Sequence, residues 1–179
     1  MTEELDVIRR VLAGDTESFR RLVDRYAGPV VRLVKDIAGD RHMCEDIAQE
    51  VFLAAFVKLR TFDPNRSQFS TWLFTIARNK SINARKRKRP LSLADVPERA
   101  DGRSPAAAAG GELFATLDEA LLGLPLHQRT AFVLVEFEQL PYETVAQIEG
   151  VRVGTIKSRV NRARNRLKKA LNRFEVDAS

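Results

Sequence analysis

Apolar residues recur at every third or fourth position over most of this chain of 179 residues. Such spacing gathers side chains on one face of an α-helix, whereas a half-buried strand needs strict alternation. Leu5, Ile8 and Leu12 show the pattern in the first segment, which we expect to end at Gly14. Since no segment alternates as a strand would, the sequence predicts an all-α protein.

Capping and breaking residues set the limits of the first helices. Asp15 or Thr16 can cap a second helix that reaches Gly39. Pro29 lies inside that pattern and predicts a kink or a break, because proline lacks the backbone N–H that the helix needs. Asp40 is then expected to cap a third helix.

A segment rich in proline, glycine and alanine divides the chain. A fourth helix starts at Ser67 or Ser70 and ends at Pro90. Residues 90–111 hold three prolines, three glycines and an alanine run, which is the composition of a flexible linker. The sequence therefore predicts two small helical domains, residues 1–89 and residues 112–179, joined by this linker.

The C-terminal half has its own helix signals. Pro125 occupies an expected first helical position, and Pro141 opens a short helix that Gly150 ends. The segment between the two prolines is apolar enough to be a strand, but its length and its helical neighbours favour a helix. A longer helix is expected from Val153.

Two basic blocks stand out from a chain with a formal net charge of +6. Residues 78–89 hold seven Lys or Arg side chains and no acid, and residues 152–174 hold nine and no acid. Like charges on one helix repel, so blocks of one sign indicate surfaces for a polyanion. An apolar content of 44% and a charged content of 30% indicate an ordinary globular protein.

Residues 142–160 have the pattern of a helix-turn-helix, in which a short helix, a tight turn and a longer helix follow one another. Gly150 can take the left-handed backbone conformation that the turn needs, and the small Ala146 lets the helices approach. In this motif the second helix enters the major groove of DNA with its N-terminal residues against base edges. The C-terminal domain is thus predicted to bind duplex DNA.

The helix after Val153 has one narrow apolar stripe, and basic side chains cover the rest of its surface. The residues expected to meet bases are Thr155, Lys157, Ser158, Arg159 and Arg162. Those expected to meet phosphates, which position the protein without specifying sequence, are Arg164, Arg166, Lys168 and Lys169. The alternatives are a merely solvated basic helix, and a membrane-surface helix, which the absence of Trp from the stripe disfavours.

The first basic block continues a helix that holds the only tryptophan, Trp72. Polar and aromatic residues next to a cationic helix suit single-stranded nucleic acid, whose bases can be stacked and read at their edges. Phe69, Trp72 and Phe74 at helical spacing are nevertheless found in a core more often than as base platforms. The basic run could also be a solvated tail before the linker.

Asp46, Gln49 and Glu50 share one face of the third predicted helix. Neither His nor a further Asp joins them at a spacing that would hold a metal ion, so a partner-binding or solvated face is favoured.

Taken together, these motifs resemble bacterial RNA polymerase sigma factors of the extracytoplasmic-function (ECF) group. The similarity is carried by "EDIAQEVFLAAF", "FSTWLFTIARN" with the basic run after it, "LP…R…FVL…E" and "YETVAQIEGVRVGTIKSRVNRARNRL". The resemblance implies two helical domains, sigma regions 2 and 4, joined by a linker without a folded region 3. It implies a promoter-specificity subunit that binds core polymerase and helps open DNA, and that needs no cofactor, metal or small-molecule substrate.

The resemblance assigns residues to partners by their place in these motifs. Asp46, Gln49 and Glu50 match the motif that binds the clamp helices of the largest polymerase subunit. The residues matching the reader of the minus-ten promoter element are Asn65, Ser67, Gln68, Phe69, Ser70, Arg78, Asn79, Lys80, Arg85, Lys86, Arg87, Lys88 and Arg89. Those matching the reader of the minus-thirty-five element are Thr155, Lys157, Ser158, Arg159, Arg162 and Arg166. Thr75 and Ile76 stand where primary sigma factors carry paired tryptophans, so the resemblance assigns no strand-opening role to Trp72.

Two other classes of function fit the sequence less well. A stand-alone helix-turn-helix regulator would explain the C-terminal domain but would leave the polar face of residues 46–50 without a role. A nucleic-acid hydrolase or nucleotidyl transferase would need a carboxylate cluster or a phosphate-binding loop, and the sequence has neither.

The resemblance further implies an anti-sigma factor that covers the polymerase-binding surfaces. We expect a cytoplasmic protein without membrane insertion, because no apolar run approaches the roughly 20 residues that a membrane span needs. His42 and Cys44 hint at a metal or redox sensor, although a buried or incidental pair is favoured. The lone Cys44 excludes an internal disulfide.

Overall fold

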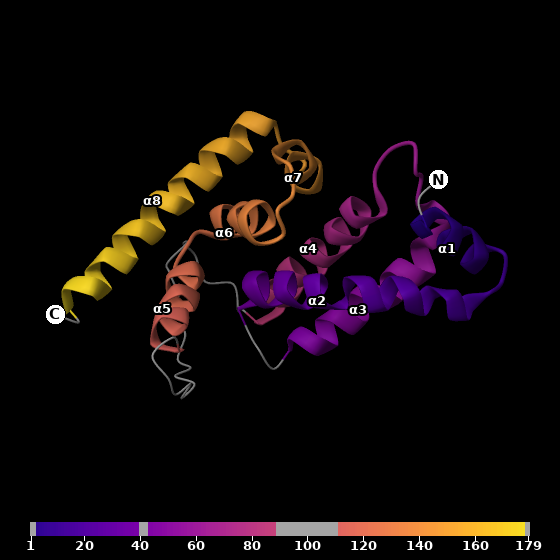
Figure 1. The fold of residues 1–179 in the computed structure, drawn as a ribbon, viewed down its shortest axis with the longest axis horizontal. Coiled ribbons are helices and arrows are strands. Elements are labelled where there is room, and N and C mark those ends of the chain that lie inside the picture. The colour runs from indigo at the N-terminus through magenta and orange to yellow at the C-terminus, as the bar shows by residue number, and fades with distance from the viewer. Residues whose placement is uncertain (1–2, 40–42, 89–110, 178–179) are drawn as a thin grey trace. The chain divides into compact units, whose positions relative to one another are not determined.

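The computed structural model describes residues 3–39, 43–88 and 111–177 (Figure 1). All regular elements in those ranges are helices, which confirms the all-α prediction and makes the strand alternative after Pro125 wrong. The chain divides into two compact units, of which the first holds Met1–Pro90 with Gln147–Gly150 and the second the remaining residues. The predicted linker lies outside the described residues, except for Gly111.

The first unit is built from four α-helices and two short 3-10 turns. They are α1 (Glu3–Leu12), η1 (Thr16–Ser18), α2 (Phe19–Ala38), α3 (Cys44–Lys58), η2 (Leu59–Thr61) and α4 (Phe69–Lys88). Helices α2, α3 and α4 pack pairwise against one another. Val30, Leu33 and Val51 have no exposed surface, and Leu73 and Ala77 of α4 are equally buried. Burial of these apolar stripes is the main force that holds the unit together.

Helix α1 is fixed to α2 by polar contacts as well as by apolar packing. The Tyr26 hydroxyl donates a hydrogen bond to the Glu4 carboxylate, and Arg25 Nη1 lies 3.4 Å from the same carboxylate. Burial and the neighbouring Glu4 carboxylate raise the pKa of Tyr26, so its phenol stays protonated and can donate.

The predicted helix limits are partly confirmed. Asp15 caps the 3-10 turn η1 that leads into α2, since its carboxylate accepts the Ser18 N–H, whereas α2 itself follows Ser18 without a side-chain cap. Gly39 ends α2 in a left-handed conformation, as predicted. Pro29 lies within α2, which continues through it, so the predicted break is wrong. Residues buried on both sides of Pro29 keep the helix packed in spite of the missing hydrogen bond. The expectation for Asp40 is also wrong, because the residue preceding α3 is Met43.

The second unit contains the C-terminal helices, apart from the last residues of α7. They are α5 (Gly111–Leu122), α6 (Leu126–Phe132), the π-helical turn η3 (Val133–Phe137), α7 (Tyr142–Glu149) and α8 (Val153–Asp177). A core cluster joins α5, α6 and α8, and its members are Leu117, Ala120, Leu121, Leu124, Phe132, Ala163 and Leu167. This packing leaves the basic side of α8 exposed.

A change of helix type follows α6. Pro125 precedes α6 as its N-cap, one position before the predicted one. At Val133 the hydrogen bonding changes from α to π, and Glu138 donates its N–H to the Val133 carbonyl at 3.1 Å. Gln139, with φ of 52°, then turns the chain towards α7.

No helix within the described ranges is long and apolar enough to cross a membrane. Over those same residues, no group of three or more His, Cys, Asp or Glu side chains gathers as metal ligands would. Cys44 is buried, and His42 lies outside the described residues.

Candidate nucleic-acid interface

The turn between α7 and α8 has the geometry that the helix-turn-helix pattern predicts. Gly150 has φ of +65°, a conformation that side-chain-bearing residues rarely adopt. Val151 then donates its N–H to the Ala146 carbonyl at 3.1 Å, and Thr155 donates to the Arg152 carbonyl at 2.9 Å as α8 begins. These bonds fix the point at which α8 leaves the turn.

Helix α8 separates its apolar stripe from its polar surface. Ile156, Val160 and Ala163 are buried, as the spacing predicts. Of the residues predicted to read bases, Lys157, Ser158 and Arg162 are exposed, whereas Thr155 and Arg159 are half-buried. The predicted phosphate-contacting residues are all exposed, namely Arg164, Arg166, Lys168 and Lys169. The basic surface therefore continues along the helix well beyond its first turns.

One of these exposed arginines forms an ion pair within its own unit. Arg164 Nη2 lies 2.5 Å from a carboxylate oxygen of Glu136, in the π-helical turn. The Glu136 carboxylate raises the pKa of Arg164, which remains a cation at every accessible pH. Spacing along the sequence did not indicate this pair, because its partners lie 28 residues apart.

In the first unit, the segment between η2 and α4 carries the polar residues predicted to capture a base. Asn65 and Gln68 are exposed, and Ser67 and Ser70 are half-buried. The prediction for Phe69 needs correction, because its ring is only 2% exposed and packs against Tyr26 and Phe62. Phe69 thus supports the segment from the core and has no surface to offer a base.

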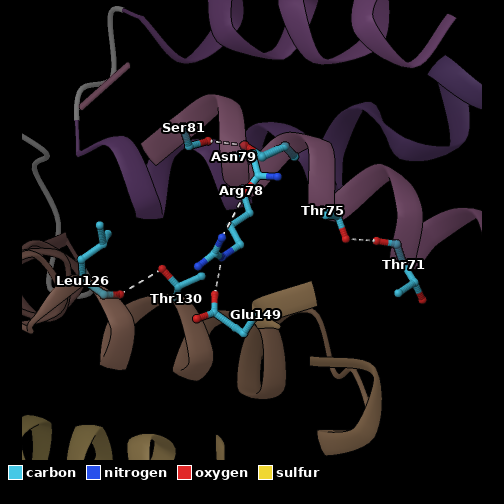
Figure 2. A network of polar contacts seen from close by, with 9 residues as sticks. Thr71, Thr75, Arg78, Asn79, Ser81, Leu126, Thr130 and Glu149 are labelled. Carbon is cyan, nitrogen blue, oxygen red and sulfur yellow. Dashed lines mark hydrogen bonds and ion pairs between the residues drawn. The ribbon is translucent and has the colours of Figure 1, made fainter. Parts of the chain in front are cut away.

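The polar face of α4 continues from that segment. Arg78 donates to the Asn79 side chain at 3.0 Å, and Asn79 is exposed (Figure 2). Figure 2 also shows the buried side of the helix, where the Thr75 hydroxyl donates to the Thr71 carbonyl at 2.8 Å and the buried Ser81 makes a similar bond to the backbone one turn earlier. The hydroxyls of Thr75 and Ser81 are thus satisfied within α4.

The basic run at the end of α4 is described as far as Lys88. Arg85 is half-buried, and Lys86 and Arg87 are exposed. The helix extends through Lys88, and Arg89 lies outside the described residues. A basic helix, not a tail of irregular backbone, therefore presents these charges.

The predicted polymerase-binding residues lie on the exposed face of α3. Asp46, Gln49 and Glu50 are all exposed. Glu50 also contacts α4, since the Lys80 ammonium nitrogen lies 2.9 Å from its carboxylate. The hydrogen bond and charge of Lys80, with a contribution from Arg87, lower the pKa of Glu50.

Two apolar residues on the same helix were missed by sequence reasoning. Leu53 is 64% exposed and Val57 is 70% exposed, although the intervening Phe56 packs edge-on against Phe19. Leu53 and Val57 follow Glu50 by three and seven positions, so they share its side of the helix. Extending the count of helical positions beyond Glu50 would have found them.

Two helical units, one with a helix-turn-helix and each with a basic helix, define a DNA-binding protein. Comparison with known families gives the same class. The family model "Sigma-70 region 2" matches residues 22–90, and "Sigma-70, region 4" matches residues 114–167. The chain belongs to the sigma-70 family, and within it to the ECF RNA polymerase sigma factors, as its relatives show.

Among these relatives is the ECF RNA polymerase sigma factor SigW of Bacillus subtilis, which is 36% identical over 92% of this chain and 94% of its own length. RNA polymerase sigma-H factor of Pseudomonas aeruginosa is 37% identical over 96% of both chains. The sigma factor RpoE of Bartonella quintana, solved with the anti-sigma factor NepR, is 28% identical, with a TM-score of 0.70 over 87% of this chain and 98% of its own.

Proposed function

We propose that this chain is a promoter-specificity subunit of bacterial RNA polymerase, which binds the core enzyme, reads two promoter elements and helps open the duplex. The observation that carries this proposal is the presence, in sigma-factor order, of two helical units with separate basic surfaces. A repressor that read one site would need the helix-turn-helix alone.

Helix α8 is assigned to the minus-thirty-five element. Lys157, Ser158 and Arg162 are exposed in its first three turns, where a recognition helix meets base edges. Arg166 and the lysines after it supply phosphate contacts, which add affinity that falls with salt.

The segment before α4 and the polar face of α4 are assigned to the minus-ten element. Asn65 and Gln68 offer amides that can read the edge of an unstacked base. Asn79 and Arg87 extend that surface along the helix, where a cation would meet the backbone of the strand.

The exposed face of α3 is assigned to core polymerase. Asp46, Gln49 and Glu50 supply the polar contacts, and Leu53 and Val57 supply adjacent apolar surface. Exposed apolar residues beside polar ones are typical of protein interfaces. The solved relative in complex with an anti-sigma factor supports a similar inhibitor for this chain, one that would cover polymerase-binding surface.

We assign no covalent chemistry to the chain, since sigma factors are not themselves catalytic enzymes. The phosphodiester bond is formed by the core polymerase, and the chain acts in the cytoplasm, where that enzyme transcribes.

Transcription by purified core polymerase on a promoter library tests the proposal. Addition of this chain should yield transcripts from a restricted set of promoters that share two elements. Reversal of charge at Glu50, as Glu50→Lys, should reduce assembly with the core. Asp24→Lys is the matched control, because Asp24 is an exposed acid of α2 outside the assigned face. Absence of both core binding and transcripts would refute the proposal.

A further inference from the structure

In the segment Phe62–Gln68, backbone N–H groups donate hydrogen bonds to one acidic residue, Asp63. A carboxylate oxygen of Asp63 accepts the backbone N–H of Asn65 at 2.9 Å. Its backbone carbonyl accepts the N–H groups of Arg66 at 3.1 Å and Ser67 at 3.3 Å. Three successive amides thus converge on Asp63, and the backbone at Asn65 is fixed by a side chain as well as by the turn itself.

Aromatic packing links the same segment to the core of the first unit. The Phe62 ring centroid lies 5.6 Å from that of Phe69, edge to face, and 5.6 Å from that of Trp72. Phe69 lies a further 5.7 Å from Tyr26, within the core of the unit. Such edge-to-face and tilted contacts hold rings in defined orientations. Phe62 therefore ties the start of the segment to the helices that form the core.

Between these anchors the segment presents its polar groups outwards. Asn65, Arg66 and Gln68 are exposed, whereas Phe62 and Asp63 are half-buried. A recognition segment that is already ordered loses less conformational entropy on binding, and so binds more tightly and more selectively.

The charge of Asp63 is unfavourable for a DNA-binding surface, because a carboxylate repels phosphate. Any favourable contribution of Asp63 to DNA binding must therefore come from the hydrogen bond that it accepts from the Asn65 N–H, and not from its charge. An asparagine at this position would retain an oxygen acceptor and remove the charge, which makes the two contributions separable.

We propose that Asp63, supported by Phe62, is a positioning residue that presets the segment around Asn65 for base recognition without itself contacting DNA. The inference rests on the proposed assignment of this segment to the minus-ten element. It adds a specificity determinant outside the residues that would touch the base.

The test compares Asp63→Ala with Asp63→Asn in the full chain assembled with core polymerase. The readouts are affinity for a fluorescent minus-ten single strand, and discrimination between the preferred strand and strands with one base replaced. We expect Asp63→Ala to lose about fivefold in affinity for the preferred strand, as the loss of one hydrogen bond would give, and to discriminate less. Asp63→Asn should keep wild-type discrimination, and neither variant should change the affinity for core polymerase.

Two further variants make the outcome decisive. Phe62→Leu should lower discrimination, because a smaller, non-aromatic side chain leaves the ring contacts with Trp72 unmade. Asp24→Ala, which removes an exposed acid of α2, controls for net charge and should leave discrimination unchanged. If Asp63→Ala and Asp63→Asn tighten DNA binding equally, charge alone explains the residue and the inference is overturned.

Failure of the inference can be separated from failure of the proposed function by two alanine variants, Asn65→Ala and Gln68→Ala. If these lose affinity while Asp63→Ala keeps wild-type affinity and discrimination, the segment reads DNA but Asp63 does not position it. If neither has any effect on binding of the strand, the assignment of the segment to the minus-ten element is itself wrong.

Discussion

Arg164 and Arg166 should contribute unequally to DNA binding, although both are exposed on α8. Arg164 is paired with Glu136 at 2.5 Å, so a phosphate must compete with a carboxylate for its guanidinium. The perturbations are Arg164→Ala and Arg166→Ala, each in the full chain. We expect Arg166→Ala to remove the larger share of salt-sensitive affinity.

The expected size follows from counterion release. Each phosphate contact contributes about 0.9 to the slope of log affinity on log salt concentration. When salt rises from roughly 50 to 200 mM, each phosphate contact therefore accounts for an about 3.5-fold loss of affinity. A variant that lacks one contact should lose that much less affinity over the same range. An exposed ion pair is worth about 0.2–1 kcal/mol, or a factor of about 1.4 to 5 in an equilibrium constant. The contact of Arg164 with phosphate should therefore be weaker by that factor than the contact of an unpaired arginine. Glu136→Gln, which removes the competing charge, should restore the lost affinity.

Fluorescence anisotropy with a duplex carrying the minus-thirty-five element, at four salt concentrations, gives the slopes. Arg166→Ala should reduce the slope by about one, and Arg164→Ala by less than half as much. Equal reductions would contradict the competition by Glu136. A change of preferred sequence in Arg166→Ala would contradict the assignment of this residue to phosphate.

Two further predictions concern stability. A double-mutant cycle on Glu50 and Lys80 should give a coupling free energy of about 0.2–1 kcal/mol in denaturant unfolding, as for other exposed pairs. Because Lys80 lowers the pKa of Glu50, this contribution is present above the ordinary carboxyl pKa and is lost as pH falls through the lowered one. A coupling that does not weaken in acid would refute the pairing. Leu33→Ala should cost about 2–5 kcal/mol, because Leu33 is fully buried, whereas Leu53→Ala should cost less than about 0.5 kcal/mol. Equal costs at the two leucines, measured by chemical denaturation, would contradict the described core.

The sequence was sufficient for features that depend on neighbours along one helix. The apolar stripe of α8, from Ile156 to Leu167, follows from helical spacing alone, and it is buried as predicted. Gly39 and Gly150 end their helices with positive φ, as glycine's conformational freedom allows. The exposed polar face of α3 likewise needed only the count from Asp46 to Glu50.

Features that depend on packing between helices could not be predicted in this way. The pairs Lys80–Glu50 and Arg164–Glu136 join residues 30 and 28 positions apart, which no local spacing relates. Phe69 matched a recognition motif, but its ring is taken up by the aromatic packing of the core. The π-helical turn at Val133 shifts the register of the chain without a change in apolar periodicity, so its sequence predicts an ordinary helix.

Crosslinking on a promoter tests the two-element account most directly. A photoreactive probe would be attached at Gln68 in one sample and at Lys157 in another, through single substitutions to cysteine, with Cys44 replaced by Ala. With core polymerase bound to a promoter, the first probe should mark DNA at the minus-ten element and the second at the minus-thirty-five element. Crosslinks from both probes to the same element would contradict the account.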